Sequence, residues 1–252
     1  MELDPLYNPY SLKGKTILIT GASSGIGRST AIECSRLGAR CVITGRNAER
    51  LQQTYESLAG EEHIQIVADL SAQDGINELV QATPQVDGVV NNAGIGLTKP
   101  IAYITQDDLN SIFQTNTFAP ILLIKALLRK KKINKNGSLV FTSSRSAYGS
   151  VLGNAVYGAS KSAITAYMHY CARELAEKQI RANAVHPAMT ETPLIYSGSL
   201  TDEDRQKDMA QYPLKRYAQP EEIAHAIIYL LSDASSWTTG TSLIIDGGLS
   251  LL

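Results

Sequence analysis

Short apolar runs rich in β-branched residues alternate along this chain with longer segments whose apolar residues recur at helical spacing. The first run, KTILIT at 15–20, is followed at once by glycine, which is typical of a buried strand. The pattern predicts strands at 15–20, 40–44, 64–68, 88–94, 138–143, 180–187 and 242–248. It predicts helices between them, at 24–37, 48–59, 76–82, 105–131, 154–178 and 220–232.

Regular alternation of strand and helix favours a parallel sheet covered on both faces, with right-handed crossovers. No linker, repeat or low-complexity segment interrupts the pattern. We therefore expect one doubly wound (Rossmann) α/β domain over residues 1–252, built on a seven-stranded parallel sheet. The segment 188–218 is rich in Thr, Ser and charge, and its apolar pattern is broken. Long excursions of this kind are usually binding loops, so we expect a substrate lid there.

The composition argues against several classes of protein. The formal net charge is −1, which gives no general attraction to nucleic acid. No apolar run approaches the roughly 18 residues of a membrane span, and the polar N-terminus has no signal-peptide core. None of the cysteines or histidines has metal-site spacing, and the cysteines form no disulfide framework: Cys34, Cys41, Cys171, His63, His169, His186 and His225. We expect a soluble cytoplasmic protein that holds no metal.

The segment TGASSGIG places Gly21, Gly25 and Gly27 between the first predicted strand and the first predicted helix. In this position glycines permit a tight turn and let the backbone approach a pyrophosphate at the helix N-terminus. The alternative is a sharp turn without a ligand. We favour a dinucleotide site because the motif opens the first strand–helix–strand unit of an alternating chain.

The end of the second strand bears on the choice of cofactor. A carboxylate at this point would bind the ribose 2′-hydroxyl of NAD. The chain has Gly45 and Arg46 there, and a guanidinium suits a 2′-phosphate. We therefore expect NADP(H) to be preferred over NAD(H). The alternative is a solvated Arg46 beside a helix that Asn47 caps.

These motifs, with others further along, resemble the short-chain dehydrogenase/reductase family in order and spacing over nearly the whole chain. The others are AD at 68–69, NNAG at 91–94, TN at 115–116, SS at 143–144, YGASK at 157–161, NAVHPAMTET at 183–192 and the C-terminal TG and DGG. The resemblance implies cofactor contacts from Gly21, Ser23, Ser24, Gly25, Ile26, Gly27, Arg46, Asp69, Leu70, Asn92, Ala93, Gly94, Tyr157, Lys161, Pro187, Thr190 and Thr192. One departure is Ala188, where the family usually has glycine. If that position needs a positive φ, alanine strains the turn.

The catalytic set that the resemblance implies is Asn116, Ser144, Tyr157 and Lys161. Ser144 follows a strand, at the edge of a parallel sheet where ligands bind. Tyr157 and Lys161 are four residues apart, on one face of the predicted helix. We expect the lysine charge to lower the pKa of the phenol, which then acts as general acid or base. The family role of Asn116 is to bend its helix and hold a water; the alternative is a buried amide bonded to backbone.

The substrate is less well defined. Candidate contacts are Ser144, Ser146, Asn154 and Tyr157, with Ile95, Gly96 and the lid as further walls. The chain resembles 3-oxoacyl-(acyl-carrier-protein) reductases, which implies NADPH-dependent reduction of a ketone, such as a 3-oxoacyl thioester. The basic run 129–135 and Arg173 could receive an acyl carrier protein, although the run also fits a solvated helix end.

Two other functions stay open. One is a dehydrogenase of a hydroxysteroid or sugar alcohol, and the other is a non-catalytic dinucleotide-sensing protein. The helices at 105–131 and 154–178 carry apolar residues on more than one face. Surplus apolar surface of this kind indicates a partner, and the family pairs these helices, so we expect a homotetramer.

Overall fold

The computed structural model describes residues 7–196 and 201–251. All strand pairs are parallel, and the sheet has the order β3-β2-β1-β4-β5-β6-β7. Its strands are β1 (Thr16–Thr20), β2 (Arg40–Gly45), β3 (Ile64–Val67), β4 (Val86–Asn91), β5 (Ile133–Thr142), β6 (Arg181–Pro187) and β7 (Ser242–Ile245). The predicted parallel seven-stranded sheet is confirmed.

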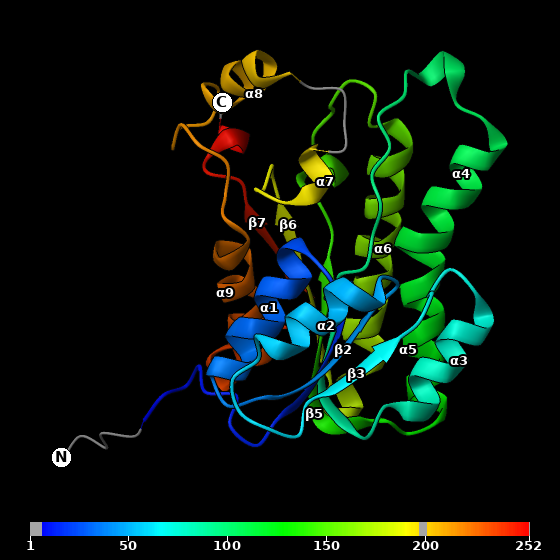
Figure 1. Cartoon of the computed structure of the whole chain (residues 1–252), viewed down its shortest axis with the longest axis vertical. Coiled ribbons are helices and arrows are strands. Elements are labelled where there is room, and N and C mark those ends of the chain that lie inside the picture. Colours follow the sequence, from blue (N-terminus) through cyan, green and yellow to red (C-terminus); the bar gives the residue numbers. More distant parts are fainter. Residues whose placement is uncertain (1–6, 197–200, 252) are drawn as a thin grey trace.

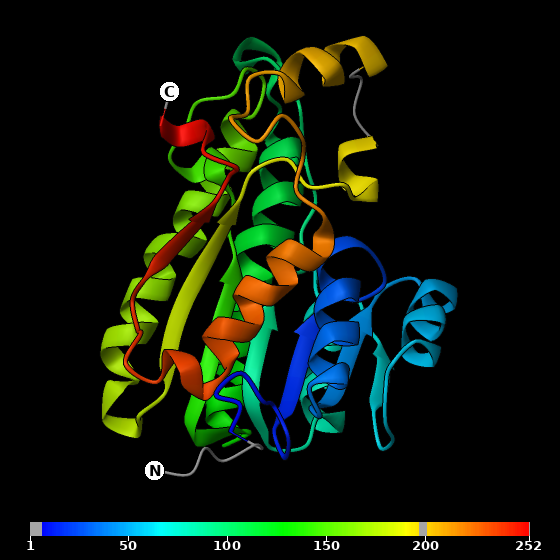
Figure 2. The same ribbon diagram turned by 90° about the vertical axis from the view of Figure 1, so that its left-hand side faces the viewer.

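Helices cover both faces of this sheet, as Figures 1 and 2 show. One layer contains α1 (Gly25–Arg36), α2 (Ala48–Glu56) and α9 (Pro220–Leu231), and the other contains α3 (Gln73–Ala82), α4 (Gln106–Phe113), α5 (Ala119–Arg129) and α6 (Ala155–Glu174). Two short helices, α7 (Pro193–Tyr196) and α8 (Asp202–Met209), lie within the predicted lid, beyond the strand ends. Short 3-10 turns are η1 (Ile101–Tyr103), η3 (Arg145–Ala147), η4 (Ala176–Lys178), η5 (Asp233–Ser235) and η6 (Leu249–Leu251).

The alternation of side chains along each strand supplies two separate cores. Ile17 and Ile19 of β1 pack with α1 and α9, whereas Leu18, between them, packs with α3, α5 and α6. The strand interiors are apolar on both faces because both faces are covered. This explains why the strands appear in the sequence as continuous apolar runs rather than as alternating ones.

The predicted helix at 105–131 differs from the structure. A π-helical turn, η2 (Gln114–Phe118), separates α4 from α5. Apolar periodicity continues across this turn, so the pattern gave no sign of it. In addition, β5 begins at Ile133, so the basic run 129–135 joins the end of α5 to the first residues of a strand. The run is thus a helix end for only part of its length.

The continuous helical stretch Gln106–Arg129 is long and apolar enough to cross a membrane by length and composition alone. Its buried residues Leu123, Ile124 and Leu127 pack into the core against the sheet. Burial in a protein core is the ordinary reason for such an apolar helix.

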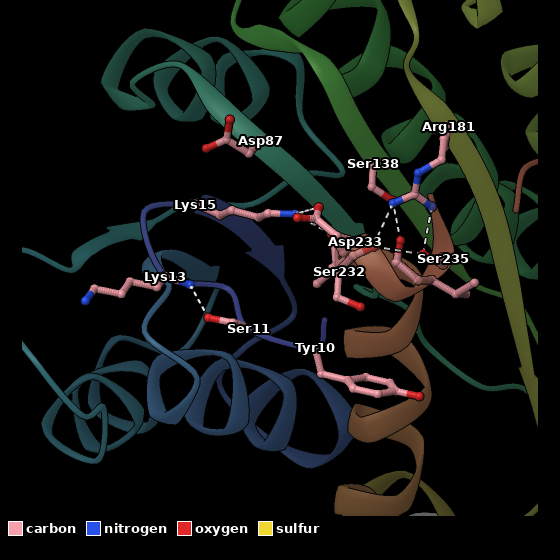
Figure 3. Close-up of polar contacts among 12 residues, drawn as sticks. Tyr10, Ser11, Lys13, Lys15, Asp87, Ser138, Arg181, Ser232, Asp233 and Ser235 are labelled. Atoms are coloured by element: carbon pink, nitrogen blue, oxygen red, sulfur yellow. Dashed lines mark hydrogen bonds and ion pairs between the residues drawn. The ribbon is translucent and has the colours of Figure 1, made fainter. Parts of the chain in front are cut away.

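At the amino ends of the strands, hydrogen bonds tie distant segments together (Figure 3). Lys15 donates to a carboxylate oxygen of Asp233 at 2.6 Å. The guanidinium of Arg181 donates to Ser235 Oγ and to the carbonyl of Ser232. Asp87 accepts from the backbone N–H of Thr16, at 2.8 Å. These contacts fix the lower rim of the sheet.

Candidate active site

A cleft of about 670 Å³ opens at the carboxyl ends of the strands, where ligands bind in parallel α/β sheets. Its lining draws on the ends of β2, β5 and β6, on the loops that follow β1, β3 and β4, on the start of α6 and on the lid. Nearly all the sequence-predicted residues line it: Gly21, Ser23, Ser24, Gly25, Ile26, Arg46, Asp69, Leu70, Asn92, Ala93, Gly94, Ser144, Ser146, Asn154, Tyr157, Lys161, Pro187, Thr190 and Thr192. The structure thus brings together segments that are far apart in the sequence.

The glycine turn is packed too closely to hold side chains. A Cβ on Gly21 would lie 2.8 Å from the Cα of Ala93, and one on Gly27 would lie 2.3 Å from the carbonyl oxygen of Gly21. Gly25 has a φ of +53°, in the left-handed region that glycine adopts readily. Gly27 does not line the cleft; it lets α1 pack closely on the end of β1.

The N-terminus of α1 is open at this turn. Its N-cap residue, Ser24, is extended and makes no side-chain cap, and the first turn holds no acidic residue. By contrast, α4 and α8 both begin with a capping box. The first N–H groups of α1 therefore have no side-chain acceptor, which suits a phosphate group.

The side chain of Thr20 pins the NNAG loop to the end of β1. Its Oγ accepts from the backbone N–H groups of Asn92 and Ala93, both at 3.0 Å, and donates to the carbonyl of Val90. Asn92 returns a bond from its side-chain amide to the carbonyl of Thr20. Sequence reasoning did not single out Thr20, because a threonine at a strand end is common.

Arg46 lies exposed directly after β2 and lines the cleft. The residue before it, Gly45, carries no side chain, so no carboxylate stands at the end of this strand. Asp69 lies across the cleft wall: hydrogen bonds from Ser71 lower its pKa, and the charge of Arg46 contributes to the same direction. A guanidinium therefore marks the position where the second strand meets the cofactor site.

Ser144 and Tyr157 meet at the floor of the cleft. Ser144 follows β5 and caps the turn at 145–147, where its Oγ accepts from the N–H of Ser146 at 3.1 Å. This leaves the hydroxyl hydrogen of Ser144 for another partner, and the side chain of Tyr157 is bonded to it. Tyr157 lies in the first turn of α6, which begins at Ala155.

Lys161 is buried one turn further along α6, at 4% exposure. Its Nζ donates to the carbonyl of Thr142 at 2.8 Å and lies 5.8 Å from the centre of the Tyr157 ring. Burial lowers the pKa of Lys161 to about 8. The predicted juxtaposition of phenol and ammonium is present.

The predicted lowering of the pKa of Tyr157 is wrong for this site. Burial raises the pKa of the phenol, and the hydrogen bond with Ser144 only partly offsets that effect. The loss of water around the phenol is the dominant cause, and the Lys161 ammonium is itself bonded to the carbonyl of Thr142. Tyr157 is therefore protonated at neutral pH, which is the form that an acid requires.

Asn116 lies in the π-helical turn and does not line the cleft. Its side-chain oxygen accepts from the N–H of Ile95, and its nitrogen donates to the carbonyl of Ile95 and to Ser160 Oγ. Its side chain is therefore the backbone-bonded amide that the sequence left as the alternative. Gly94 separates it from Lys161: a Cβ there would be 3.2 Å from Asn116 Oδ1 and 3.3 Å from Lys161 Nζ. The widened turn at Asn116 fits the expected bend in the helix.

The departure at Ala188 has no backbone cost, because this residue is not in the left-handed region. Its N–H instead donates to the carbonyl of Ile245 and extends the pairing of β6 with β7. Pro187 ends β6, and Thr192 reaches back to the glycine turn, where its Cγ would be 3.0 Å from a Cβ on Gly25. Positions 197–200 of the predicted lid lie outside the described residues.

The cleft fits a dinucleotide. Thr44, the last residue but one of β2, and Thr142, the last of β5, belong to its lining, and their hydroxyls are buried and have no partner among the described residues. Buried polar groups are normally bonded, so these point to a ligand. The open N-terminus of α1 and the glycine cradle can receive a pyrophosphate. Within residues 7–196 and 201–251, no group of three or more His, Cys, Asp or Glu gathers as a metal site.

Two residues near the catalytic set were missed. His186, buried on β6, lies 3.0 Å from the carbonyl oxygen of Ser144 through its Nδ1. Because a carbonyl only accepts, Nδ1 is the protonated nitrogen. Arg145 follows Ser144 and lines the cleft. The sequence had one signal for each: a histidine in an apolar strand and a cation beside the catalytic serine. Of the predicted walls, Gly96 lines the cleft and Ile95 does not.

Comparisons with known proteins agree with this geometry. A family model described as Enoyl-(Acyl carrier protein) reductase matches residues 21–250. An L-xylulose reductase from Caenorhabditis elegans is 34% identical over 246 residues, covering 96% of this chain and 98% of the relative. A 3-oxoacyl-(acyl-carrier-protein) reductase from Thermotoga maritima is 34% identical over 245 residues, covering 94% and 98%.

A solved structure shows the same fold. It is a putative NAD(P)-dependent gluconate 5-dehydrogenase from Beutenbergia cavernae with bound NADP. It has a TM-score of 0.88 at 30% identity and covers 97% of this chain and 100% of its own. Proteins similar to this chain thus act on a sugar ketone, on an acyl thioester and on a sugar acid, according to their names.

Proposed function

This chain belongs to the short-chain dehydrogenase/reductase family and is an oxidoreductase, and we propose that it reduces a small polar ketone to a secondary alcohol with NADPH. The observation that carries the proposal is the convergence of Ser144, Tyr157 and Lys161 in one cleft, with Lys161 Nζ 5.8 Å from the centre of the Tyr157 ring. The phenol is protonated at neutral pH, since burial raises its pKa, and carbonyl reduction requires that proton.

The residues divide the work as follows. The glycine turn, the N-terminus of α1 and Arg46 would hold NADPH, whose chemistry when bound would be to supply the hydride for the carbonyl carbon. When substrate binds, Ser144 turns its one hydroxyl hydrogen from Tyr157 to the carbonyl oxygen and holds the substrate in place. Tyr157 gives its proton to the same oxygen as negative charge develops there. Lys161, with its Nζ 5.8 Å from the ring centre, stabilises the phenolate that remains.

The test is Tyr157→Phe, which removes the acidic proton and keeps the ring. We expect turnover to fall by about 10²- to 10⁴-fold, the usual contribution of a positioned acid, while NADPH binding stays within threefold by fluorescence titration. Turnover is followed by NADPH absorbance with a panel of ketones that includes L-xylulose and 3-oxoacyl thioesters. A variant that turns over a substrate at the wild-type rate disproves the mechanism. If no ketone is reduced by the wild type, a dinucleotide-sensing role becomes the better explanation.

The preference for NADP(H) is also part of the proposal, and Arg46 supports it. A guanidinium at the end of β2 can bind a 2′-phosphate in bidentate geometry. Arg46→Ala should weaken NADPH by about 10- to 100-fold and NADH by less than threefold. Arg36→Ala, at the exposed end of α1 and outside the cleft, is the matched control. Equal losses for the two cofactors in Arg46→Ala overturn this assignment.

The cleft wall favours a small polar ketone over a carrier-bound thioester. Ser146, Asn154 and Thr98 bring hydroxyl and amide groups to the lining, together with apolar side chains such as Val151, Leu152 and Leu249. The basic run 129–135 and Arg173 adjoin the other end of the sheet, since β5 starts at Ile133 and Arg173 ends α6. A ten-residue strand spans roughly 33 Å. Within one chain, a carrier seated there is remote from Tyr157.

We also propose a homotetramer with two interfaces. Phe118 and Tyr170 expose 48% and 68% of their surface on the helical layer of α4–α6. The sheet edge at β7 exposes Ile244, and Trp237, in the segment that leads into β7, is fully exposed. Two apolar faces on one subunit allow a closed assembly with two kinds of contact. A monomeric mass by light scattering after gel filtration at low salt overturns it.

A further inference from the structure

Arg145 places a positive charge at the substrate end of the cleft, and no side chain within residues 7–196 and 201–251 accepts a hydrogen bond from it. It directly follows Ser144 and lines the cleft together with Tyr212 and Leu249. Its side chain is three-quarters buried, with 24% exposed. Among the described residues, its Nε has no hydrogen-bond partner although that atom is buried. Buried arginine donors are normally bonded, so the missing partner calls for an explanation.

The nearest carboxylate does not supply the partner. Asp246 Oδ2 lies 4.0 Å from Arg145 Nε, which is beyond hydrogen-bond distance. Its oxygens instead accept from the N–H groups of Gly248, at 3.0 Å, and Ser250, at 2.7 Å. These bonds and the charge of Arg145 outweigh burial and lower the pKa of Asp246. The carboxylate is therefore charged and serves the C-terminal turn.

The guanidinium has a fixed seat. A Cβ on Gly149 would lie 3.2 to 3.4 Å from Arg145 Cζ, Nη1 and Nη2, so the plane of the guanidinium lies directly on this glycine. Its placement is thus set by the backbone of the turn that Ser144 caps. Arg145 and Ser144 are adjacent in the chain. A molecule whose carbonyl is held by Ser144 and whose charged group is held by Arg145 is therefore short.

We propose that Arg145 binds a carboxylate of the substrate, so that the preferred ketone is a keto acid on a short carbon chain. The inference rests on the proposed function, ketone reduction at Ser144 and Tyr157. A guanidinium binds a carboxylate in bidentate geometry. A singly charged group suits the place, because the charged Asp246 stands beside the guanidinium and disfavours a doubly charged phosphate. The hydroxyl groups of Ser146 and Thr98 on the cleft wall suit a hydroxylated chain.

The experiment compares kcat/KM for matched ketones, measured on the full-length protein in the assembly that it forms in solution. The pairs are 4-oxopentanoate against its methyl ester, and 5-keto-D-gluconate against L-xylulose, each with NADPH. We expect kcat/KM to favour the acid of each pair by about 10- to 100-fold, the value of a hydrogen-bonded charge pair. In Arg145→Met this ratio should fall to about one, and Arg145→Lys should keep part of it. Arg129→Met, at the exposed end of α5, is the control whose ratio should not change.

A second variant tests the same contact without removing the cation. Gly149→Ala pushes on the far end of a flexible side chain, so it displaces the guanidinium at little cost to folding. The acid-to-ester ratio should fall by about three- to tenfold. A binding readout needs no turnover: D-gluconate should raise the melting temperature of the wild type in the presence of NADP, and not that of Arg145→Met.

The outcomes separate the two proposals. If the wild type reduces none of the four ketones, nor the wider panel, ketone reduction itself fails. If it reduces them without preferring the acids, or keeps the preference in Arg145→Met, the carboxylate site is wrong and ketone reduction stands.

Discussion

The two ends of the sheet differ in how their polar side chains are bonded. We call the amino ends of the strands the lower rim and the carboxyl ends, which face the cleft, the upper rim. At the amino ends of the strands, Lys15 and Arg181 have the partners that Figure 3 shows, and Asp87 accepts from the N–H of Thr16. These bonds join β1, β4, β6 and the end of α9. At the carboxyl ends, buried side-chain atoms of five residues lack partners among the described residues: Thr44, Asn91, Thr142, Arg145 and His186. The other unpartnered residues in the described chain are Thr30, within α1, and Gln65 and Ser242, at the starts of the two edge strands β3 and β7.

This difference separates folding from function within one sheet. Bonds made within the chain stabilise it, whereas buried groups left without partners cost free energy and are kept where a ligand completes them. At β1, β4 and β6 the amino ends therefore lie in a closed network, and the carboxyl ends of β2, β4, β5 and β6 hold the unpartnered groups. The comparison predicts that substitutions at the lower rim reduce stability and spare activity, and that substitutions at the upper rim do the reverse.

The largest effect should come from Lys161→Met. We expect turnover to fall by about 10²-fold or more, because the phenolate loses its stabilising charge. We also expect the variant to be more stable than the wild type at pH 7. The pKa of Lys161 falls from 10.5 to about 8 on folding, which corresponds to a cost of about 3 kcal/mol at low pH. The variant also loses the hydrogen bond from Lys161 to the carbonyl of Thr142, which reduces its gain in stability by about 1 kcal/mol.

The stability difference between Lys161→Met and the wild type should depend on pH. Below about pH 8 the lysine is charged in both the folded and the unfolded chain, so the folded state bears the whole cost. Between about pH 8 and pH 10.5 only the unfolded chain holds the proton, so wild-type stability rises with pH. The advantage of Lys161→Met in urea unfolding should thus shrink over this range. An advantage that is constant with pH contradicts the assignment.

Asp87→Ala tests the lower rim. The N–H of Thr16 and the amide of Asn134 both lose their acceptor, at 2.8 Å in each case. We expect the free energy of unfolding to fall by about 1–3 kcal/mol, measured in urea, with kcat and KM within twofold of the wild type. Asp87→Asn keeps one acceptor oxygen and should lose less. A large loss of activity in a folded Asp87→Ala protein would show that the two rims are not separate.

His186 tests whether the upper rim positions the catalytic serine. Its Nδ1–H holds the carbonyl of Ser144, and its ring packs on Tyr148 with centres 4.7 Å apart. His186→Leu should lower kcat by about tenfold, the worth of one hydrogen bond, with NADPH affinity unchanged. In His186→Asn the side-chain amide can donate from the position of Nδ1, so most of the activity should return. A loss of similar size in both variants indicates packing alone.

The sequence predicted what repeats and what has a fixed spacing. Continuous apolar runs, separated by helical segments, predicted all the strands, and the glycine turn predicted the place of the cleft. Both predictions follow from local geometry. The π-helical turn at Asn116 was not predictable from periodicity, since apolar positions continue through it. The partner of Asn116 is Ile95, which only the fold brings near. The pKa of Tyr157 depends on burial, and burial at a cleft floor cannot be read from the spacing of Tyr157 and Lys161.

The smallest effect should come from Asp233→Ala, and it distinguishes two explanations of the lower rim. Lys15 and Asp233 are 2.6 Å apart, but the aspartate side chain is 79% exposed. Exposed ion pairs contribute about 0.2–1 kcal/mol and are weakened by salt. Urea midpoints of the variant and the wild type should therefore differ slightly at low salt and converge at high salt. A larger, salt-independent loss would mean that Asp233 acts through Arg181. The guanidinium of Arg181 bonds the same turn. Burial lowers the pKa of Arg181, and the charge of Asp233 opposes that effect. In that case the lower rim is stabilised by buried charge, and the contrast with the upper rim becomes one of satisfied against unsatisfied arginine, Arg181 against Arg145.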